Sequence, residues 1–282
     1  MRPFLYLLML FTTTALAESP VAKCAHFPYG FFSGFHTIIG LLDAYDNGKL
    51  GGIEVDLKTT GFYYDKAKGP NWWQYYFEPF SMNIEDNAPR IHIDLDRYRF
   101  YSHRGDALAK TRSCYLINKY IKIQPKILKE LNDFLRKNVE THYLIGVHYR
   151  GTDKMWGEAS RLSVSSAVNK IEQELSHMEK PSNFKIFVAT DSQHFLDYMK
   201  NRFGTKICYF EMERSTDNQP IHSCGKSSGY EKGKTALLDC LVLSKTNFLF
   251  CTSSNLNNVS LMFNPSIAVF YLNEDTRWWK KK

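Results

Sequence analysis

The sequence predicts an α/β fold with a parallel sheet and helices on both of its faces, on three observations. Through the second half of the chain, short apolar runs of strand length alternate with segments of helical periodicity. Polar residues directly follow three of those runs. The chain of 282 residues, 44% hydrophobic and 23% charged, is long enough to bury the core of one or two domains.

The second half carries the clearest alternation. It predicts strands over 143–147, 184–189, 206–210, 247–251 and 267–271, separated by helices over 163–177, 192–202 and 234–245 and by a polar loop over 211–233. In the first half, the spacing of apolar residues predicts strands over 53–57 and 91–95 and helices over 36–45 and from 125 onward. Ligands of open α/β sheets bind beyond the carboxyl ends of the strands, so polar residues at those ends form the candidate site.

Residues 1–17 have the pattern of a signal peptide. Arg2 supplies the positive charge, Phe4 to Phe11 the apolar stretch, and Ala15-Leu16-Ala17 a cleavage sequence. An uncleaved signal anchor is the alternative, and no later segment has the length and apolar character of a membrane span. We therefore expect the rest of the chain in the lumen of the secretory pathway, in the endoplasmic reticulum or Golgi, or exported.

Three other patterns point to weaker hypotheses. The segment 229–235, GYEKGKT, is similar to a phosphate-binding P-loop, but it has three residues between its glycines instead of four, and no strand precedes it directly. Its Lys234, at a helix start, could still touch a phosphate. Asp94-Leu95-Asp96 is better explained by surface exposure than by a metal, and no Cys/His cluster has zinc spacing, so no metal site is predicted. Cys208 and Cys224 flank a loop-like stretch and are the preferred disulfide pair of an exported chain.

Three polar clusters fall at the carboxyl ends of predicted strands: His148 to Lys154, Thr190-Asp191, and Thr252 to Ser254. Helix N-termini point toward the same edge and favour phosphate groups. Arg150, directly after a strand, has a planar guanidinium that can clamp a diphosphate. A surface ion pair with Asp153 is the alternative. The convergence of the three clusters favours a nucleotide-binding domain.

Two more residues fit a nucleotide. His148 follows a strand and can contact a phosphate or a base edge. Asp239 lies in a predicted helix among leucines and a valine, and a buried carboxylate needs a partner. That partner is either a guanine edge, with its N1–H and N2 amino donors, or a structural salt bridge, and composition leaves both open.

These residues resemble the α-1,6-fucosyltransferase family, which includes the core N-glycan and nodulation-factor enzymes. The segment 148–154, HYRGTDK, resembles the family's H-x-R-R-T-D-K motif, and 188–191, VATD, matches its next strand end. Leu237-Leu238-Asp239 with the segment 244–249, SKTNFL, and then 251–254, CTSS, follow in the family's order. The first half resembles the family only loosely.

The resemblance implies a GT-B architecture, with two Rossmann-like halves facing a cleft, divided here into 18–140 on the acceptor side and 141–282 on the GDP-sugar side. It also implies roles for the matched positions: Arg150 on the pyrophosphate, His148 and Asp239 on guanosine, Asp191 at the donor pocket, Ser253 or Ser254 on the diphosphate, and Glu158, four residues after Lys154, as general base. Asp153 and Thr252 belong to the same clusters. The family's second Arg is replaced by Gly151.

The predicted function is inverting, metal-independent transfer of fucose from GDP-fucose to a glycan or glycoprotein hydroxyl, with no other cofactor. Such a transfer needs a base for the acceptor proton and positive charge on the departing diphosphate, which Arg150 and Lys154 supply. A GDP-sugar- or glycan-binding protein that has lost transfer activity is the alternative. The net charge of +7 is spread along the chain and accompanies no nucleic-acid-binding motif.

Overall fold

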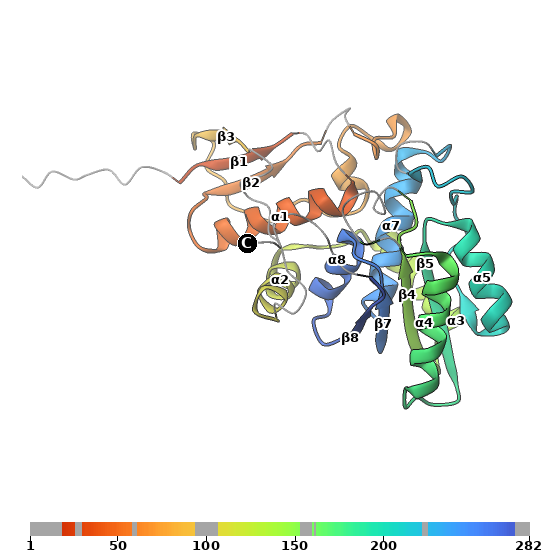
Figure 1. Ribbon diagram of the computed structural model, residues 1–282. Coiled ribbons are helices and arrows are strands. Elements are labelled where there is room, and N and C mark those ends of the chain that lie inside the picture. The colour runs from red at the N-terminus through yellow and green to blue at the C-terminus, as the bar shows by residue number, and fades with distance from the viewer. Residues whose placement is uncertain are drawn as a thin grey trace, which may run out of the picture.

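The protein is described by a computed structural model (Figure 1). The described residues are 19–25, 30–57, 61–93, 107–152, 160, 162–221 and 225–273. Their elements, in chain order, are β1 (Val21–Cys24), α1 (Phe31–Asp46), β2 (Gly52–Val55), η1 (Lys66–Lys68), η2 (Trp72–Tyr75), β3 (Arg90–His92), α2 (Ala107–Tyr120), α3 (Pro125–Asn138), β4 (Tyr143–Tyr149), α4 (Val164–His177), β5 (Phe184–Thr190), α5 (Gln193–Phe203), η4 (Gly204–Lys206), β6 (Ile207–Cys208), α7 (Gly229–Leu243), β7 (Phe248–Cys251), α8 (Asn255–Phe263) and β8 (Ala268–Tyr271).

The second half forms a five-stranded parallel sheet in the order β6-β5-β4-β7-β8. The chain runs outward from β4 to β6, then returns to β4's other side and runs outward again to β8. The strand order therefore reverses between β4 and β7, and the crevice at such a switch point is where α/β sheets bind ligands. The α/β class and the parallel sheet predicted from the sequence are confirmed.

The central strands are buried on both faces, which explains why their sequences are near-continuous apolar runs. Ile145, Val147 and Tyr149 of β4 pack in one cluster with residues of α4 and α5. Leu144, on the opposite face, packs in a second cluster that includes residues of α7 and α8. His148 has the same parity as Leu144, so it belongs to the face that α7 and α8 cover.

The first half forms a smaller parallel sheet, β2-β1-β3, with α1 packed beneath it (Figure 1). The sequence did not predict β1, which has only four residues, or α2, whose apolar residues lack a clear stripe. Helix α1 begins at Phe31, five residues before the predicted start, because the aromatic segment that precedes position 36 is itself helical and buried.

Helices of the two halves pack on one another and share one apolar cluster. Helix α8 lies between α2 and the five-stranded sheet (Figure 1), and Phe35 meets Phe263 with ring centroids 5.9 Å apart. Tyr76 stacks on Tyr230 at 5.9 Å and an interplanar angle of 4°. The three-stranded and five-stranded sheets are thus joined by packed aromatic side chains.

Two predictions around the polar loop over 211–233 are wrong: the start of the helix that follows it and the disulfide between Cys208 and Cys224. Helix α7 begins at Gly229 and not at 234, with Ser228 accepting a hydrogen bond from the backbone N–H of Glu231 (3.3 Å) as its cap. The P-loop-like segment is therefore the first turns of a helix. Strand β6 ends at Cys208, whose thiol is free and donates to the carbonyl of Ile186 (3.7 Å), so it forms no disulfide with Cys224.

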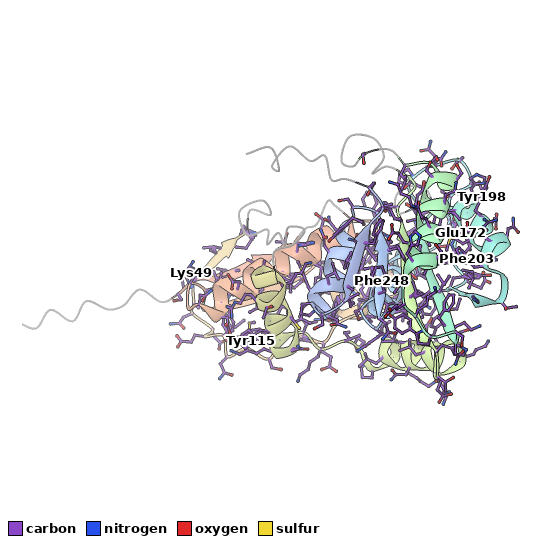
Figure 2. All side chains as sticks on the ribbon, turned by 60° about the horizontal axis from the view of Figure 1, so that its bottom comes forward. Lys49, Tyr115, Glu172, Tyr198, Phe203 and Phe248 are labelled. Carbon is purple, nitrogen blue, oxygen red and sulfur yellow. The ribbon has the colours of Figure 1, made fainter. Side chains whose placement is uncertain are left out.

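Several predictions fall on residues outside the described ranges: the signal peptide over 1–17, the acidic triplet over 94–96, and Cys224. Within the described residues, no helix combines the length and apolar character needed to cross a bilayer. The exposed aromatic side chains Tyr115, on α2, and Tyr198, on α5, lie at opposite ends of the molecule (Figure 2), so they do not form one surface patch.

Candidate functional site

The ends of β4 and β7 are tied together at the switch point. The backbone N–H of Thr252 donates to the carbonyl of His148 (2.9 Å), and the backbone N–H of Arg150 donates to Oγ1 of Thr252 (2.8 Å). On the other side, Oγ1 of Thr190 donates to the carbonyl of Tyr149 (2.7 Å). The three polar clusters predicted at strand ends do meet at one edge of the sheet.

Asp191 organises the turn that follows β4. Its carboxylate accepts the backbone N–H of Gly151 (2.9 Å) and the hydroxyl of Thr152 (2.6 Å), and it lies 3.1 Å from Nε of Arg150. Only 8% of Asp191 is exposed. Since a buried carboxylate is costly without partners, these contacts both stabilise Asp191 and orient Arg150. Arg150 thus forms an ion pair with Asp191. Asp153, the partner considered from the sequence, lies outside the described residues.

The turn leaves no room for a side chain at position 151. A Cβ atom on Gly151 would lie 2.7 Å from Cε1 of Tyr149 and 3.1 Å from Cβ of Ser192. The ring of Tyr149 is held in place, because it stacks on Phe195 at 4.2 Å and 6° and its hydroxyl donates to the carbonyl of Leu162 (2.8 Å). Glycine is therefore required sterically where the resembling family carries its second Arg.

His148 is buried and neutral at this edge. Only 3% of it is exposed, and burial lowers its pKa to about 4, with a further lowering by Arg150 and opposing effects of Asp191 and Asn257. Its Nδ1 is buried without a hydrogen-bond partner among the described residues. A neutral imidazole with an unused ring nitrogen is suited to a polar ligand contact and not to charge neutralisation.

Asp239 is a buried carboxylate with no hydrogen bond or ion pair in the described part of the chain. It is 4% exposed, and burial raises its pKa to about 7, against the opposing field of Arg214. Arg214 donates to the carbonyls of Phe210 (2.7 Å) and Met212 (3.3 Å), and its Nε is buried and unpartnered. Among the described residues, Asp239 therefore makes no direct salt bridge of the kind considered from the sequence.

The third cluster begins helix α8, whose N-terminus carries unsatisfied backbone N–H groups and partial positive charge. Ser254 caps the helix through its Oγ, which accepts the backbone N–H of Leu256 (3.3 Å). The backbone N–H of Ser253 donates to the amide oxygen of Asn273 (2.8 Å), and its hydroxyl forms no hydrogen bond among the described residues. Both serine hydroxyls therefore keep an O–H that can donate, since Ser254 acts only as an acceptor in its cap.

Other predicted residues are placed differently or lie outside the described ranges. Lys234 sits inside α7 and pairs with Glu231 (2.9 Å) and Glu130 (3.4 Å), so its ammonium is already neutralised. Asp153, Lys154 and Glu158 fall within 153–159, which the structure does not describe. Among the residues that it does describe, no three His, Cys, Asp or Glu side chains gather in a way that could hold a metal ion.

The sequence predicted a strand over 143–147 with Tyr149 in the polar cluster after it, but β4 continues to Tyr149, whose side chain is buried. Sequence reasoning missed two residues of this edge, Asn257 and Arg214, and Arg214 lay in what looked like a loop. Asn257 carried a usable signal, because it is a polar residue in the first turn of an otherwise apolar helix, where a buried amide requires hydrogen-bond partners.

The profile of the family described as "Alpha-(1,6)-fucosyltransferase N- and catalytic domains" matches residues 113–260, just over half of the chain. The matched range holds every described site residue above apart from Asn273, including Arg150, Asp191 and Asp239.

Solved structures of similar fold are those of fucosyltransferases. NodZ alpha-1,6-fucosyltransferase soaked with GDP-fucose aligns with a TM-score of 0.57 and 16% identity, over 88% of this chain and 94% of that one. NodZ from Bradyrhizobium aligns with a TM-score of 0.53 and 15% identity, over 86% of this chain and 92% of that one. An Arabidopsis thaliana FUT1 mutant in complex with GDP aligns with a TM-score of 0.54 and 9% identity, over 92% of this chain and 71% of that one. At these identities the likeness is one of fold, and the family match carries the assignment: the chain belongs to the alpha-(1,6)-fucosyltransferase family and is a glycosyltransferase.

Proposed function

We propose that the protein transfers fucose from GDP-fucose to a hydroxyl of a glycan or glycoprotein, with inversion and without a metal. The observation that carries the proposal is the carboxylate of Asp239 in α7, which is buried and has no hydrogen-bond partner among the described residues. Guanine offers N1–H and N2 amino donors on one edge, which is what such a carboxylate lacks. His148 supports the same proposal as a second buried polar group at this edge.

In the proposed reaction, an acceptor oxygen attacks the anomeric carbon of fucose while the bond from that carbon to the diphosphate oxygen breaks. The electron pair leaves with GDP, and the acceptor proton passes to Glu158. Arg150, oriented by Asp191, and Lys154 stabilise the negative charge that develops on the diphosphate. The hydroxyl of Ser253 and the N-terminus of α8 add donors for the same group.

The proposal includes the organisation of the chain. The three-stranded sheet, within 18–140, would bind the acceptor and the five-stranded sheet, within 141–282, the donor, on either side of a cleft as in GT-B enzymes. Residues 1–17 would direct the chain to the secretory lumen or to export.

A nucleotide panel tests the donor site. Thermal shifts with GDP, GDP-fucose, UDP and ADP should show stabilisation by the two guanine nucleotides alone. Arg150→Ala should weaken GDP binding about 10- to 100-fold, on the scale of a lost charged hydrogen bond. Arg202→Ala is the matched control, because Arg202 pairs at the surface with Glu172, on α4 (Figure 2), and should leave the shift unchanged.

Activity tests the chemistry. Glu158→Gln should bind GDP as the wild type does and lose transfer, and EDTA should leave wild-type transfer intact. GDP binding without transfer to any glycan acceptor would instead favour the alternative, a GDP-sugar- or glycan-binding protein of this fold. The absence of any nucleotide shift would refute both.

A further inference from the structure

The side chains of His148 and Asn257 are complementary polar groups, each with one buried polar atom that has no hydrogen-bond partner among the described residues. Asn257 is completely buried and His148 nearly so. The buried atoms without partners are Nδ1 of the imidazole and Oδ1 of the amide, so one can donate and the other can only accept. Unpaired buried polar atoms are costly, and two of them on neighbouring elements call for an explanation.

The strand register places the two side chains together. His148 of β4 is paired with Cys251 of β7. Nδ2 of Asn257 donates to the sulfur of Cys251 (3.4 Å), which brings the amide to the strand neighbour of His148. Nδ1 and Oδ1 do not meet the geometry of a hydrogen bond, but the two side chains lie close enough for a hydrogen-bonding interaction with Asn257 to raise the pKa of His148.

We propose that Asn257 is a positioning residue for nucleotide binding, which selects the tautomer of His148 by accepting its Nδ1–H. Nε2 is then an acceptor that faces a donor of the guanosine. The inference rests on the proposed function, because it assumes that His148 contacts that nucleoside. Hydrogen bonds of ligand sites are often long before the ligand binds, so the bond is expected to close in the complex.

A neutral amide suits this role better than a carboxylate would. The charged groups that act on His148 are Asp191 and Arg150, and the oxygens of Asp191 are already engaged by the turn. With an amide as its partner, the imidazole stays uncharged near neutral pH, and the direction of its remaining hydrogen bond is fixed. Without that partner, the ring is free to place its proton on Nε2 and to present a donor where the ligand needs an acceptor.

The experiment combines ¹⁵N NMR of the histidine ring with GDP titration. In the wild type with GDP, His148 should show a protonated Nδ1 and an unprotonated Nε2. Asn257→Leu, close in volume and apolar, should lose that preference and bind GDP about 10-fold more weakly, the equivalent of one buried hydrogen bond. Asn257→Asp keeps an acceptor, so it should retain the Nδ1–H tautomer and raise the pKa of His148.

Asn258→Leu is the matched control, because Asn258 is half-buried at the next position of the same helix. It should leave the tautomer and the GDP affinity as in the wild type. The inference is overturned if Asn257→Leu folds, by circular dichroism, and keeps both the Nδ1–H tautomer and full affinity for GDP. Failure of the wild type to bind GDP would instead count against the proposed function, which separates the two results.

Discussion

At the end of β4, the ring of Tyr149 fills the space that a side chain at position 151 would need. The Tyr149 ring is held by Phe195 and by the carbonyl of Leu162, and it lies where a side chain on residue 151 would begin. The replacement of the family's second Arg by glycine is therefore coupled to the tyrosine two residues earlier. The glycine lets the Tyr149 ring pack against the turn, and the ion pair between Arg150 and Asp191 is kept.

This coupling predicts a non-additive double-mutant cycle. Gly151→Arg alone should destabilise the protein by about 1–3 kcal/mol, because it overpacks the turn against a fixed ring. In Tyr149→Ala/Gly151→Arg, the ring is absent. The free energy of unfolding of the double variant should therefore exceed, by about 1 kcal/mol or more, the value expected from adding the two single effects. Urea denaturation of the four proteins measures this difference. Additive effects would mean that the turn moves away from Tyr149 and that the two positions are independent.

At the scale of elements, the start of α7 is fixed by contacts with the first half. The hydroxyl of Tyr76 donates to the carbonyls of Tyr230 (3.0 Å) and Gly229 (3.3 Å), and Tyr76 is completely buried. A Cβ on Gly233 would lie 2.3 Å from that hydroxyl. The glycines that look like helix breakers in the sequence are thus positions of close approach between elements.

Removal of the Tyr76 hydroxyl should loosen this junction locally. Tyr76→Phe should lower the free energy of unfolding by about 1 kcal/mol and raise amide hydrogen exchange at the start of α7. Tyr75→Phe is the matched control, since the Tyr75 hydroxyl donates to the carbonyls of Asp65 and Gly69 within the first half. It should have a similar global effect and leave exchange in α7 unchanged. Equal exchange of α7 in both variants would show that the Tyr76 hydroxyl does not hold the helix.

The sequence was informative where local pattern determines structure. The strands of the five-stranded sheet are apolar runs, and their ends carry the site, so Arg150, Asp191 and Thr252 could be predicted to meet. The hydrogen bonds of Asp191 to the turn, the exclusion of a side chain at position 151 and the position of Asn257 beside the strand neighbour of His148 depend on contacts between distant segments. The short β1 was missed because four residues carry too little periodicity to indicate a strand.

Over the whole molecule, two buried groups couple stability to pH in opposite directions. The pKa of Asp239 is raised from 3.8 to about 7, so between these values the folded state holds a proton that the unfolded state has lost, and stability falls as pH rises. The pKa of His148 is lowered from 6.5 to about 4, so between these values the unfolded state binds the extra proton, and stability is lost as pH falls. The two effects oppose each other between about pH 4 and 6.5.

Single substitutions should separate these effects. In Asp239→Asn the His148 contribution remains alone, so relative to wild type the free energy of unfolding should drop as pH falls from 6.5 to 4. In His148→Gln the Asp239 contribution remains, so the same quantity should drop as pH rises from 4 to 7. Each slope should approach about 1.4 kcal/mol per pH unit, the value for one proton. Urea denaturation at pH 4.5, 5.5 and 6.5 measures both slopes without nucleotide. Parallel pH profiles for the two variants would contradict the opposing shifts, and slopes of opposite sign would show that the candidate site holds an acid and a base, both uncharged at mildly acidic pH.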